Sequence, residues 1–289
     1  MSKPTGTASG HRHADTILRN GQIYTMEPDV PKVEALAIRD GRIIALGSTA
    51  QISALADTET AIVDLRGRMA MPGLIDAHCH PTKGAIADLF SCKFGFTASL
   101  DDIARALTTF IAKHPEVEWI IGGRWGSGLF ESNPIPSPRH WLDQYSAGKA
   151  VYLRDDSGHN GWANSAALQR LGVTADTPDP RGGTIVRDPR SGEPTGLLLE
   201  EADVAARSRV PDWSDEQYRS GVQEMVQIAN RYDITGITDA DATEPLLKAY
   251  RDIDHAGALS LHVAAAISTP YGHRTTPLDY DLIEALRDR

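Results

Sequence analysis

The chain has 289 residues, which is enough for one large domain or two smaller ones. Its formal net charge is −10 and it has no basic run, which argues against a nucleic-acid-binding surface. No apolar stretch approaches membrane-spanning length, and we expect no signal peptide. Two cysteines are too few for a disulfide scaffold, so the cytoplasm is the simplest location to expect.

The first two segments differ in character. Residues 1–14 are rich in Ser, Thr, Gly and Pro and show no periodicity, which predicts a disordered leader. Residues 15–70 contain short apolar runs separated by tight turns. The Asn-Gly pair at 20–21 and the Asp-Gly pair at 40–41 are typical of hairpin turns, so we expect a small antiparallel β unit. So few strands rarely stand alone, and this unit should pack against a neighbouring domain.

Two histidines stand at the end of the next apolar run. Leu74 to Ala77 is typical of a short buried strand, and His78 and His80 follow at a spacing of two residues. In an extended backbone alternate side chains leave on the same face, so both imidazoles can reach one point while Cys79 faces away. Neutral imidazole is a favoured ligand of zinc and other transition metals. The alternative is two ordinary histidines at a strand end.

Helices and strands alternate in the following part of the chain. A helix is predicted at 103–113, after capping residues, and buried strands are predicted at 119–123 and 150–154. A loop rich in Pro, Ser and Asn follows the first of these strands, just after Trp125. Loops of this kind, leaving strand ends, often carry substrate contacts.

A polar segment continues from the strand at 150–154. Residues 158–168 read Gly-His-Asn-Gly-Trp-Ala-Asn-Ser-Ala-Ala-Leu, and a helix is predicted to start near Asn164. This places His159 and Asn164 at a rim that could face a ligand. On the residues alone, turn and capping chemistry is the stronger interpretation, with Asn164 or Ser165 capping the helix and His159 on the surface.

A glutamate follows a predicted hairpin. Residues 182–188 and 192–196 form the hairpin, and the run 197–202, which contains Glu200, is predicted to begin a helix. A glutamate at this place could ligate a metal or hold a ligand histidine in one tautomer. It could equally be a solvated residue in the first helical turn, where the helix dipole favours acidic side chains.

The C-terminal part again alternates helix and strand. The strand at 259–265 contains His262, which we expect to be packed in the core. Alternation of this kind is typical of βαβ units and predicts a parallel sheet. The predicted elements are a helix at 215–231, a strand at 234–240, a helix at 245–257, a strand at 259–265 and a helix at 281–289.

Three of these motifs together resemble one family. Residues 72–81, Pro-Gly-Leu-Ile-Asp-Ala-His-Cys-His-Pro, resemble the first metal-binding strand of the amidohydrolase superfamily. Residues 158–168 resemble the signature Gly-His-x-x-Trp-x-Asn-Ser-x-Ala-Leu of its YtcJ-like, or amidohydrolase 3, branch, which includes N-substituted formamide deformylases. Residues 192–200 resemble the pattern Gly-Glu-Pro-Thr-Gly-x-Leu-x-Glu, so Glu200 aligns with that family's carboxylate. The resemblance implies an α/β fold with a TIM-type (β/α)8 barrel.

The implied barrel is incomplete in this chain. Strands ending near residues 78, 122, 154 and 240, with the strand at 259–265, are about half of what a closed barrel needs. No segment matches the later histidines or the late aspartate base that the resemblance implies. We therefore expect the N-terminal half of a longer enzyme. Its expected domains are part of a β-sandwich at 15–70 and the barrel at 71–289, with an insertion at about 85–210.

The favoured hypothesis is hydrolysis of an amide or other non-peptide C–N bond, using a divalent metal, expected to be zinc, that His78 and His80 hold in part. Trp125, His159 and Asn164 would bind a small-molecule substrate. Glu200 would act in catalysis. Two alternatives stay open: a non-catalytic fragment with a binding or regulatory role, and assembly of this half with a partner chain, including a homo-oligomer. Neither a nucleic acid nor a membrane is expected as a partner.

Overall fold

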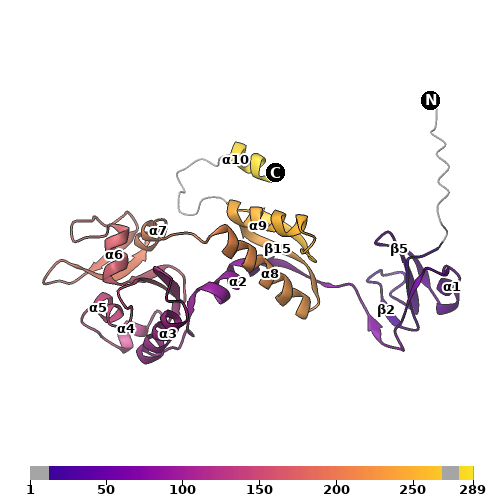
Figure 1. The fold of residues 1–289 in the computed structure, drawn as a ribbon, viewed down its shortest axis with the longest axis horizontal. Helices are drawn as coiled ribbons and strands as arrows, with labels where there is room; N and C mark the ends of the chain where they lie inside the picture. The colour runs from indigo at the N-terminus through magenta and orange to yellow at the C-terminus, as the bar shows by residue number, and fades with distance from the viewer. Residues whose placement is uncertain (1–12, 269–279, 289) are drawn as a thin grey trace. The chain divides into compact units, whose positions relative to one another are not determined.

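The computed structural model describes residues 13–268 and 280–288, and the predicted leader at 1–14 lies almost wholly outside these ranges. The chain divides into two compact units, and the division falls between Leu74 and Ile75. Each unit has its own sheets and its own apolar core. Figure 1 shows the fold, coloured along the chain from indigo to yellow.

Unit 1 contains two small sheets and one short helix, α1 (Thr49–Ser53). Ile17 is fully buried and packs with Ala35, Ala37 and Ile52. The central strand β1 pairs antiparallel with β4 but parallel with β6, so the unit is mixed and not purely antiparallel as predicted. The sheet orders are β5 (Arg42–Gly47), β4 (Ala35–Arg39), β1 (Thr16–Arg19), β6 (Ala61–Asp64), and β3 (Lys32–Val33), β2 (Gln22–Tyr24), β7 (Met69–Ala70).

The two predicted hairpin turns have different outcomes. Asp40 and Gly41 connect β4 to β5 with φ values of 51° and 70°, so this hairpin is confirmed. The hairpin predicted at 20–21 is wrong, because β1 and β2 belong to different sheets. β1 takes its hydrogen-bond partners from β4 and β6, whereas β2 takes its partners from β3 and β7. The turn therefore leads the chain from one sheet into the other.

Unit 2 contains a six-stranded sheet, which we call the inserted sheet. Strands β9, β10 and β11 are parallel, and β12, β14 and β13 continue the sheet in antiparallel pairs. The order is β13 (Gly183–Arg187), β14 (Pro194–Glu200), β12 (Asn160–Ala163), β11 (Ala150–Asp155), β10 (Trp119–Trp125), β9 (Cys92–Lys93). The accompanying helices are α3 (Leu100–Lys113), α4 (Leu129–Ser132), α5 (Pro138–Asp143), α6 (Ser165–Leu171) and α7 (Glu201–Arg207).

Strand β11 is buried on both faces of the inserted sheet. Val151 and Leu153 belong to one apolar cluster, while Ala150 and Tyr152 belong to another. This follows from the two-residue period of a strand, which sends alternate side chains to opposite faces. The polar residues that end β11 are therefore fixed by a strand that cannot shift without exposing its core.

Two sequence predictions for this region are wrong. The strands ending near residues 122 and 154 are β10 and β11 of the inserted sheet, and neither pairs with the strand that carries His78. The run 197–200 is the end of β14 and not the start of a helix, because it pairs with β12 and β13. Glu200 is therefore the last residue of a strand, and α7 begins one residue later.

A second sheet of unit 2 has the order β16 (His262–Ile267), β15 (Ile234–Ala242), β8 (Leu74–Cys79). Helices α2 (Pro81–Phe90), α8 (Asp215–Arg231) and α9 (Glu244–His255) pack with it, and α10 (Tyr280–Arg287) ends the described chain. The amphipathic pattern explains α8, since Tyr218, Val222 and Met225 are buried on one side of it. Strands β15 and β16 are parallel, as the helix-strand alternation predicts.

The outer strands of this second sheet expose apolar side chains. Leu74 is 50% exposed and Ile75 is 73% exposed, although both lie in a strand predicted to be buried. His262, predicted to be packed in the core, is also exposed, because most of β16 faces solvent in this structure. Among the described residues, no helix is both long enough and apolar enough to cross a membrane.

Candidate functional site

The two predicted metal ligands lie together at the end of β8. The rings of His78 and His80 have centroids 5.5 Å apart and are nearly perpendicular, at 81°. Both side chains are exposed. His80 is also the residue that precedes α2, and Pro81 at the first position of that helix ends the strand. The strand end thus brings two imidazoles close together at one accessible place.

The residue between the histidines faces the other side of the strand. Cys79 is half-buried and packs against the apolar cluster of α2, α8, α9 and β15. Its thiol lies 3.5 Å from the carbonyl oxygen of Thr238 on β15. Burial raises the pKa of this thiol, and the charges of Asp76 and Asp239 raise it further. Cys79 therefore faces away from the two histidines, as the alternation predicted, and its packing anchors the strand.

An ion pair that the sequence analysis missed stands beside the histidines. The ammonium group of Lys83 on α2 contacts the carboxylate of Asp241 on β15. Burial raises the pKa of Asp241, but hydrogen bonds from Lys83 and Ser268 and the charges of Lys83 and His80 outweigh it, so the pKa lies below its ordinary value. The sequence offered one signal for it: Asp239 and Asp241 stand at alternate positions near the end of the predicted strand.

A buried hydrogen-bond network connects α9, β15 and α2 near the two histidines. The hydroxyl of Tyr250 on α9 donates to Oδ2 of Asp239 at 2.7 Å, and it lies 2.7 Å from the hydroxyl oxygen of Thr82 on α2. Asp239 and Thr82 are fully buried. Burial raises the pKa of Tyr250, so the phenol stays protonated and can donate. This network ties α9 to β15 and to α2, the helix that follows the histidine strand.

The pair of imidazoles fits part of a metal site. Residues 13–268 and 280–288 contain no group of three or more His, Cys, Asp or Glu side chains arranged to hold a metal ion. A catalytic zinc takes about three protein ligands and leaves one position open. His78 and His80, being adjacent and accessible, suit two of those positions, and a complete site needs a ligand beyond them.

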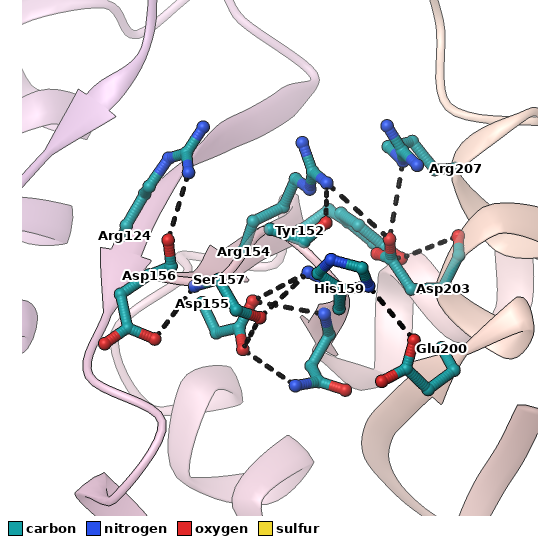
Figure 2. A network of polar contacts seen from close by, with 12 residues as sticks. Arg124, Tyr152, Arg154, Asp155, Asp156, Ser157, His159, Glu200, Asp203 and Arg207 are labelled. Carbon is teal, nitrogen blue, oxygen red and sulfur yellow. Dashed lines mark hydrogen bonds and ion pairs between the residues drawn. The ribbon is translucent and has the colours of Figure 1, made fainter. Parts of the chain in front are cut away.

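A second polar region lies at the turn between β11 and β12 (Figure 2). Asp155 is fully buried, and Oδ1 accepts from the backbone N–H groups of His159 and Asn160, each at 3.1 Å. Oδ2 accepts from the Ser157 hydroxyl and the Asn160 amide, each at 2.7 Å. Burial raises the pKa of Asp155, but these hydrogen bonds outweigh it, so the pKa lies below its ordinary value. An ionised carboxylate therefore organises the turn.

His159 and Glu200 come together in this region. Nδ1 of His159 lies 3.0 Å from Oε2 of Glu200, and the backbone N–H of Glu200 donates to the carbonyl oxygen of His159 at 2.9 Å. Both side chains are more than half exposed. Glu200 has a φ of 52° and a ψ of −120°, a strained conformation for a residue other than glycine. The contact fits a carboxylate that fixes one tautomer of a histidine.

The other two predicted substrate-binding residues are buried. Trp125 is 3% exposed and its ring stacks edge-on against Phe130, with centroids 5.2 Å apart. Asn164 is fully buried, and its Oδ1 accepts from the N–H groups of Val151 and Ala167, each at 2.9 Å. For Asn164 the structure thus shows the helix-capping alternative. Neither side chain offers a surface to a ligand in this structure.

Arginines beside this turn were not singled out from the sequence. Arg154 on β11 and Arg207 on α7 both approach Oδ2 of Asp203, at 3.9 Å and 3.4 Å, and the Tyr152 hydroxyl donates to its Oδ1 at 2.7 Å. Burial raises the pKa of the fully buried Asp203, while Tyr152 and the two guanidinium charges act against that rise. In the sequence, these arginines could have been noticed only as charged residues near the end of an apolar strand, as Arg154 is.

Comparison with known proteins shows a likeness in fold and a match to a family. The fold resembles that of a protein described as an uncharacterized metal-dependent hydrolase from Pyrococcus horikoshii OT3, with a TM-score of 0.67 and 23% identity, covering 87% of this chain and 48% of that one. At this identity the likeness concerns the fold alone. A family model described as Amidohydrolase family matches residues 61–286. The chain belongs to the amidohydrolase family, which confirms the resemblance seen in its motifs.

Curated relatives agree with this assignment. The chain is 30% identical over 250 residues to an N-substituted formamide deformylase of Arthrobacter pascens, covering 85% of this chain and 46% of the relative. It is 34% identical over 196 residues to YtcJ of Bacillus subtilis, covering 68% of this chain and 36% of the relative. The chain therefore spans less than half the length of each of these relatives.

Proposed function

We propose that this chain forms part of a metal-dependent hydrolase that cleaves an amide or other non-peptide C–N bond. The observation that carries the proposal is the pair of adjacent, accessible imidazoles of His78 and His80 at the end of β8. Membership of the amidohydrolase family supports it. The deformylase relative supports a C–N substrate. The metal is proposed to be zinc, for which neutral imidazole is a common ligand.

In this proposal His78 and His80 hold the metal in part. A metal of this kind supplies a lowered pKa of bound water and a polarised substrate carbonyl. The contact between Cys79 and β15 holds both rings on the accessible side of the strand. The ion pair of Lys83 with Asp241 holds α2 against β15 beside them. These residues fix the position of the imidazoles before any ligand binds.

His159 and Glu200 are proposed to contact substrate and move a proton. In the neutral tautomer whose Nδ1–H donates to Glu200, Nε2 carries no proton and can accept a hydrogen bond. The strained backbone of Glu200, and the hydrogen bond from its N–H to the carbonyl oxygen of His159, hold the two side chains next to each other. Trp125 and Asn164, both buried, are proposed to support the substrate region by packing and capping.

We propose that β8, β15 and β16 are strands of a (β/α)8 barrel and that the two sheets of unit 1 form part of a β-sandwich domain. The exposed apolar residues of β8 support the first proposal, because parallel barrel strands are normally buried on both faces. A small-molecule substrate, a cytoplasmic location and a homo-oligomeric assembly are also proposals. The net charge of −10 supports a partner other than nucleic acid.

Metal analysis of the purified protein tests the function. The wild type should carry bound zinc, and His78→Ala and His80→Ala should each lose most of it, because each removes one of the few protein ligands, about three, that such a site has. His114→Ala, which changes a histidine at the end of α3, is the control and should retain the metal. Equal metal content in all four folded proteins would refute the assignment.

A further inference from the structure

Three guanidinium groups stand along one edge of the polar network in Figure 2. They belong to Arg124 on β10, Arg154 on β11 and Arg207 at the end of α7. Nη1 of Arg124 and Nη2 of Arg154 lie 3.6 Å and 3.2 Å from the point that a Cβ on Gly158 would occupy. Arg154 and Arg207 both approach Oδ2 of Asp203. The three cations are therefore neighbours, and we call them the arginine row.

The positive charge of the arginine row is only partly compensated. Burial lowers the pKa of Arg154, and the charges of Arg207 and Arg124 lower it further, against the opposing effect of Asp203. Asp203 contacts two of the three guanidinium groups and is itself fully buried. Asp155, the next carboxylate along the turn, is occupied by the turn's own N–H and hydroxyl groups. One carboxylate therefore contacts two of the three cations, and the third, Arg124, makes no ion pair among the described residues.

Several donors of the arginine row are unused. Nε of Arg154 is buried and has no hydrogen-bond partner in the described part of the chain. Arg124 donates from Nη1 to the carbonyl oxygen of Asp156 at 3.1 Å, and its other nitrogens have no partner among the described residues. Arg207 uses Nε toward Asp203, and within residues 13–268 and 280–288 its terminal nitrogens make no hydrogen bond. Planar guanidinium donors of this kind match the oxygens of carboxylate and phosphate groups.

Gly158 keeps the space between two of these cations open. Its φ of +75° favours glycine, and a side chain there would stand against Nη2 of Arg154 and Nη1 of Arg124. The carbonyl oxygen of the same glycine accepts from Arg154, which holds that guanidinium in place. The turn thus combines a guanidinium held by a backbone carbonyl, a second one with unused donors, and a glycine that places no side chain against either.

We propose that Arg124, Arg154 and Arg207 bind an oxyanion of a small ligand, a phosphate or a carboxylate group. This site lies in the inserted sheet, on residues other than the histidine pair, and does not depend on the hydrolase function. The anion supplies the negative charge that the row lacks and accepts from its unused donors. Charge-assisted bonds to guanidinium groups have the strength to hold such a group in a partly exposed place.

Calorimetric titration of the whole chain with inorganic phosphate and with acetate, at low ionic strength, tests the proposal. The wild type should bind at least one of these anions, and added chloride should weaken binding. Arg124→Gln and Arg207→Gln should each weaken it about ten-fold or more, because each removes a charged donor. The matched control is Arg105→Gln on α3, whose side chain is 72% exposed and whose affinity should equal that of the wild type.

The two probes also identify the ligand class. Tighter binding of phosphate indicates a phosphate-bearing ligand, and equal or tighter binding of acetate indicates a carboxylate. Arg124 and Arg207 are exposed, so both variants should keep the wild-type melting temperature. Arg154→Lys, which keeps the charge but loses the planar fork, should also bind more weakly. Absence of binding by the folded wild type, or unchanged affinity in both Gln variants, would overturn the proposal.

Discussion

At the scale of single residues, Asp155 makes the stability of the inserted sheet depend on pH. Its folded-state pKa lies below the ordinary value, so the ionised form stabilises the fold. That contribution is fully present above the unfolded-state pKa of about 3.9 and is lost as the pH falls through the lower folded-state pKa. We expect Asp155→Asn to lower the unfolding free energy by about 2 kcal/mol at pH 7, because it removes charge-assisted bonds.

Urea unfolding at pH 7 and at about pH 3 measures this effect. The difference between the wild type and Asp155→Asn should shrink at the lower pH, where the wild type loses part of the contribution and the variant has none to lose. Asp29→Asn, in an exposed turn, is the control and should follow the wild type at both pH values. Parallel loss of stability in wild type and Asp155→Asn would contradict this role of the carboxylate.

The candidate site was predictable only as separate residues. His78 and His80 are two positions apart at the end of one strand, so their proximity follows from local geometry alone. His159 and Glu200 were each singled out, but their contact spans 41 positions and depends on β12 pairing with β14. No local pattern carries that information. The sequence therefore singled out individual candidate residues but did not predict which of them meet.

At the scale of elements, Asn164 joins β11 to α6. Its Oδ1 caps the helix through Ala167 N–H and also accepts from Val151 N–H, while its amide donates to the carbonyl oxygen of Lys149 at 2.9 Å. We expect Asn164→Ala to lower the unfolding free energy by about 3 kcal/mol, because it leaves buried backbone groups unpaired. Urea unfolding measures the loss.

Asn230→Ala provides the comparison for this change. Asn230 is exposed at the end of α8, and its amide donates to one hydroxyl, that of Ser260, at 2.8 Å. A surface hydrogen bond of this kind should be worth less than about 1 kcal/mol. If the two alanine variants were equally stable, the cap would not be the link between strand and helix that the hydrogen bonds indicate.

Elements with strong local signals were predicted well, and those defined by pairing were not. The helix at 215–231 was predicted with the bounds observed, because it combines an amphipathic stripe with an N-cap at Ser214. The run 197–200 was predicted as helix, but so short a run of leucines is compatible with helix and with strand. Its pairing with β12 and β13 decides for strand, and that partner choice is not encoded locally.

At the scale of the whole molecule, the alternation of helix and strand predicted a mixed α/β fold but counted strands of two sheets together. Parallel strands β10 and β11 look like barrel strands in sequence, since both are apolar and follow helical or loop segments. In the structure they pair with each other and with β9 and β12, and the sheet of β8, β15 and β16 is separate. The spacing of apolar residues indicates which side chains are buried, but it does not indicate to which sheet a strand belongs.

The exposed strand β8 predicts self-association of this chain. In the described residues its one neighbour in the sheet is β15, and Ile75 is 73% exposed. A sheet edge with exposed apolar side chains is a template for pairing with another chain. Sedimentation velocity should show mass that rises with concentration, and Ile75→Lys should weaken association about ten-fold or more, because it places a charge where an apolar contact of about 2 kcal/mol forms.

Val30→Lys separates this effect from a general gain in charge. Val30 is 46% exposed in a turn of unit 1, so a lysine there adds the same charge without changing β8. This variant should associate as the wild type does, and both variants should keep the wild-type melting temperature because neither side chain is buried. A single monomeric species in the wild type at every concentration would mean that β8 does not act as an open edge. Equal behaviour of the two lysine variants would show instead that net charge, and not this strand, controls association.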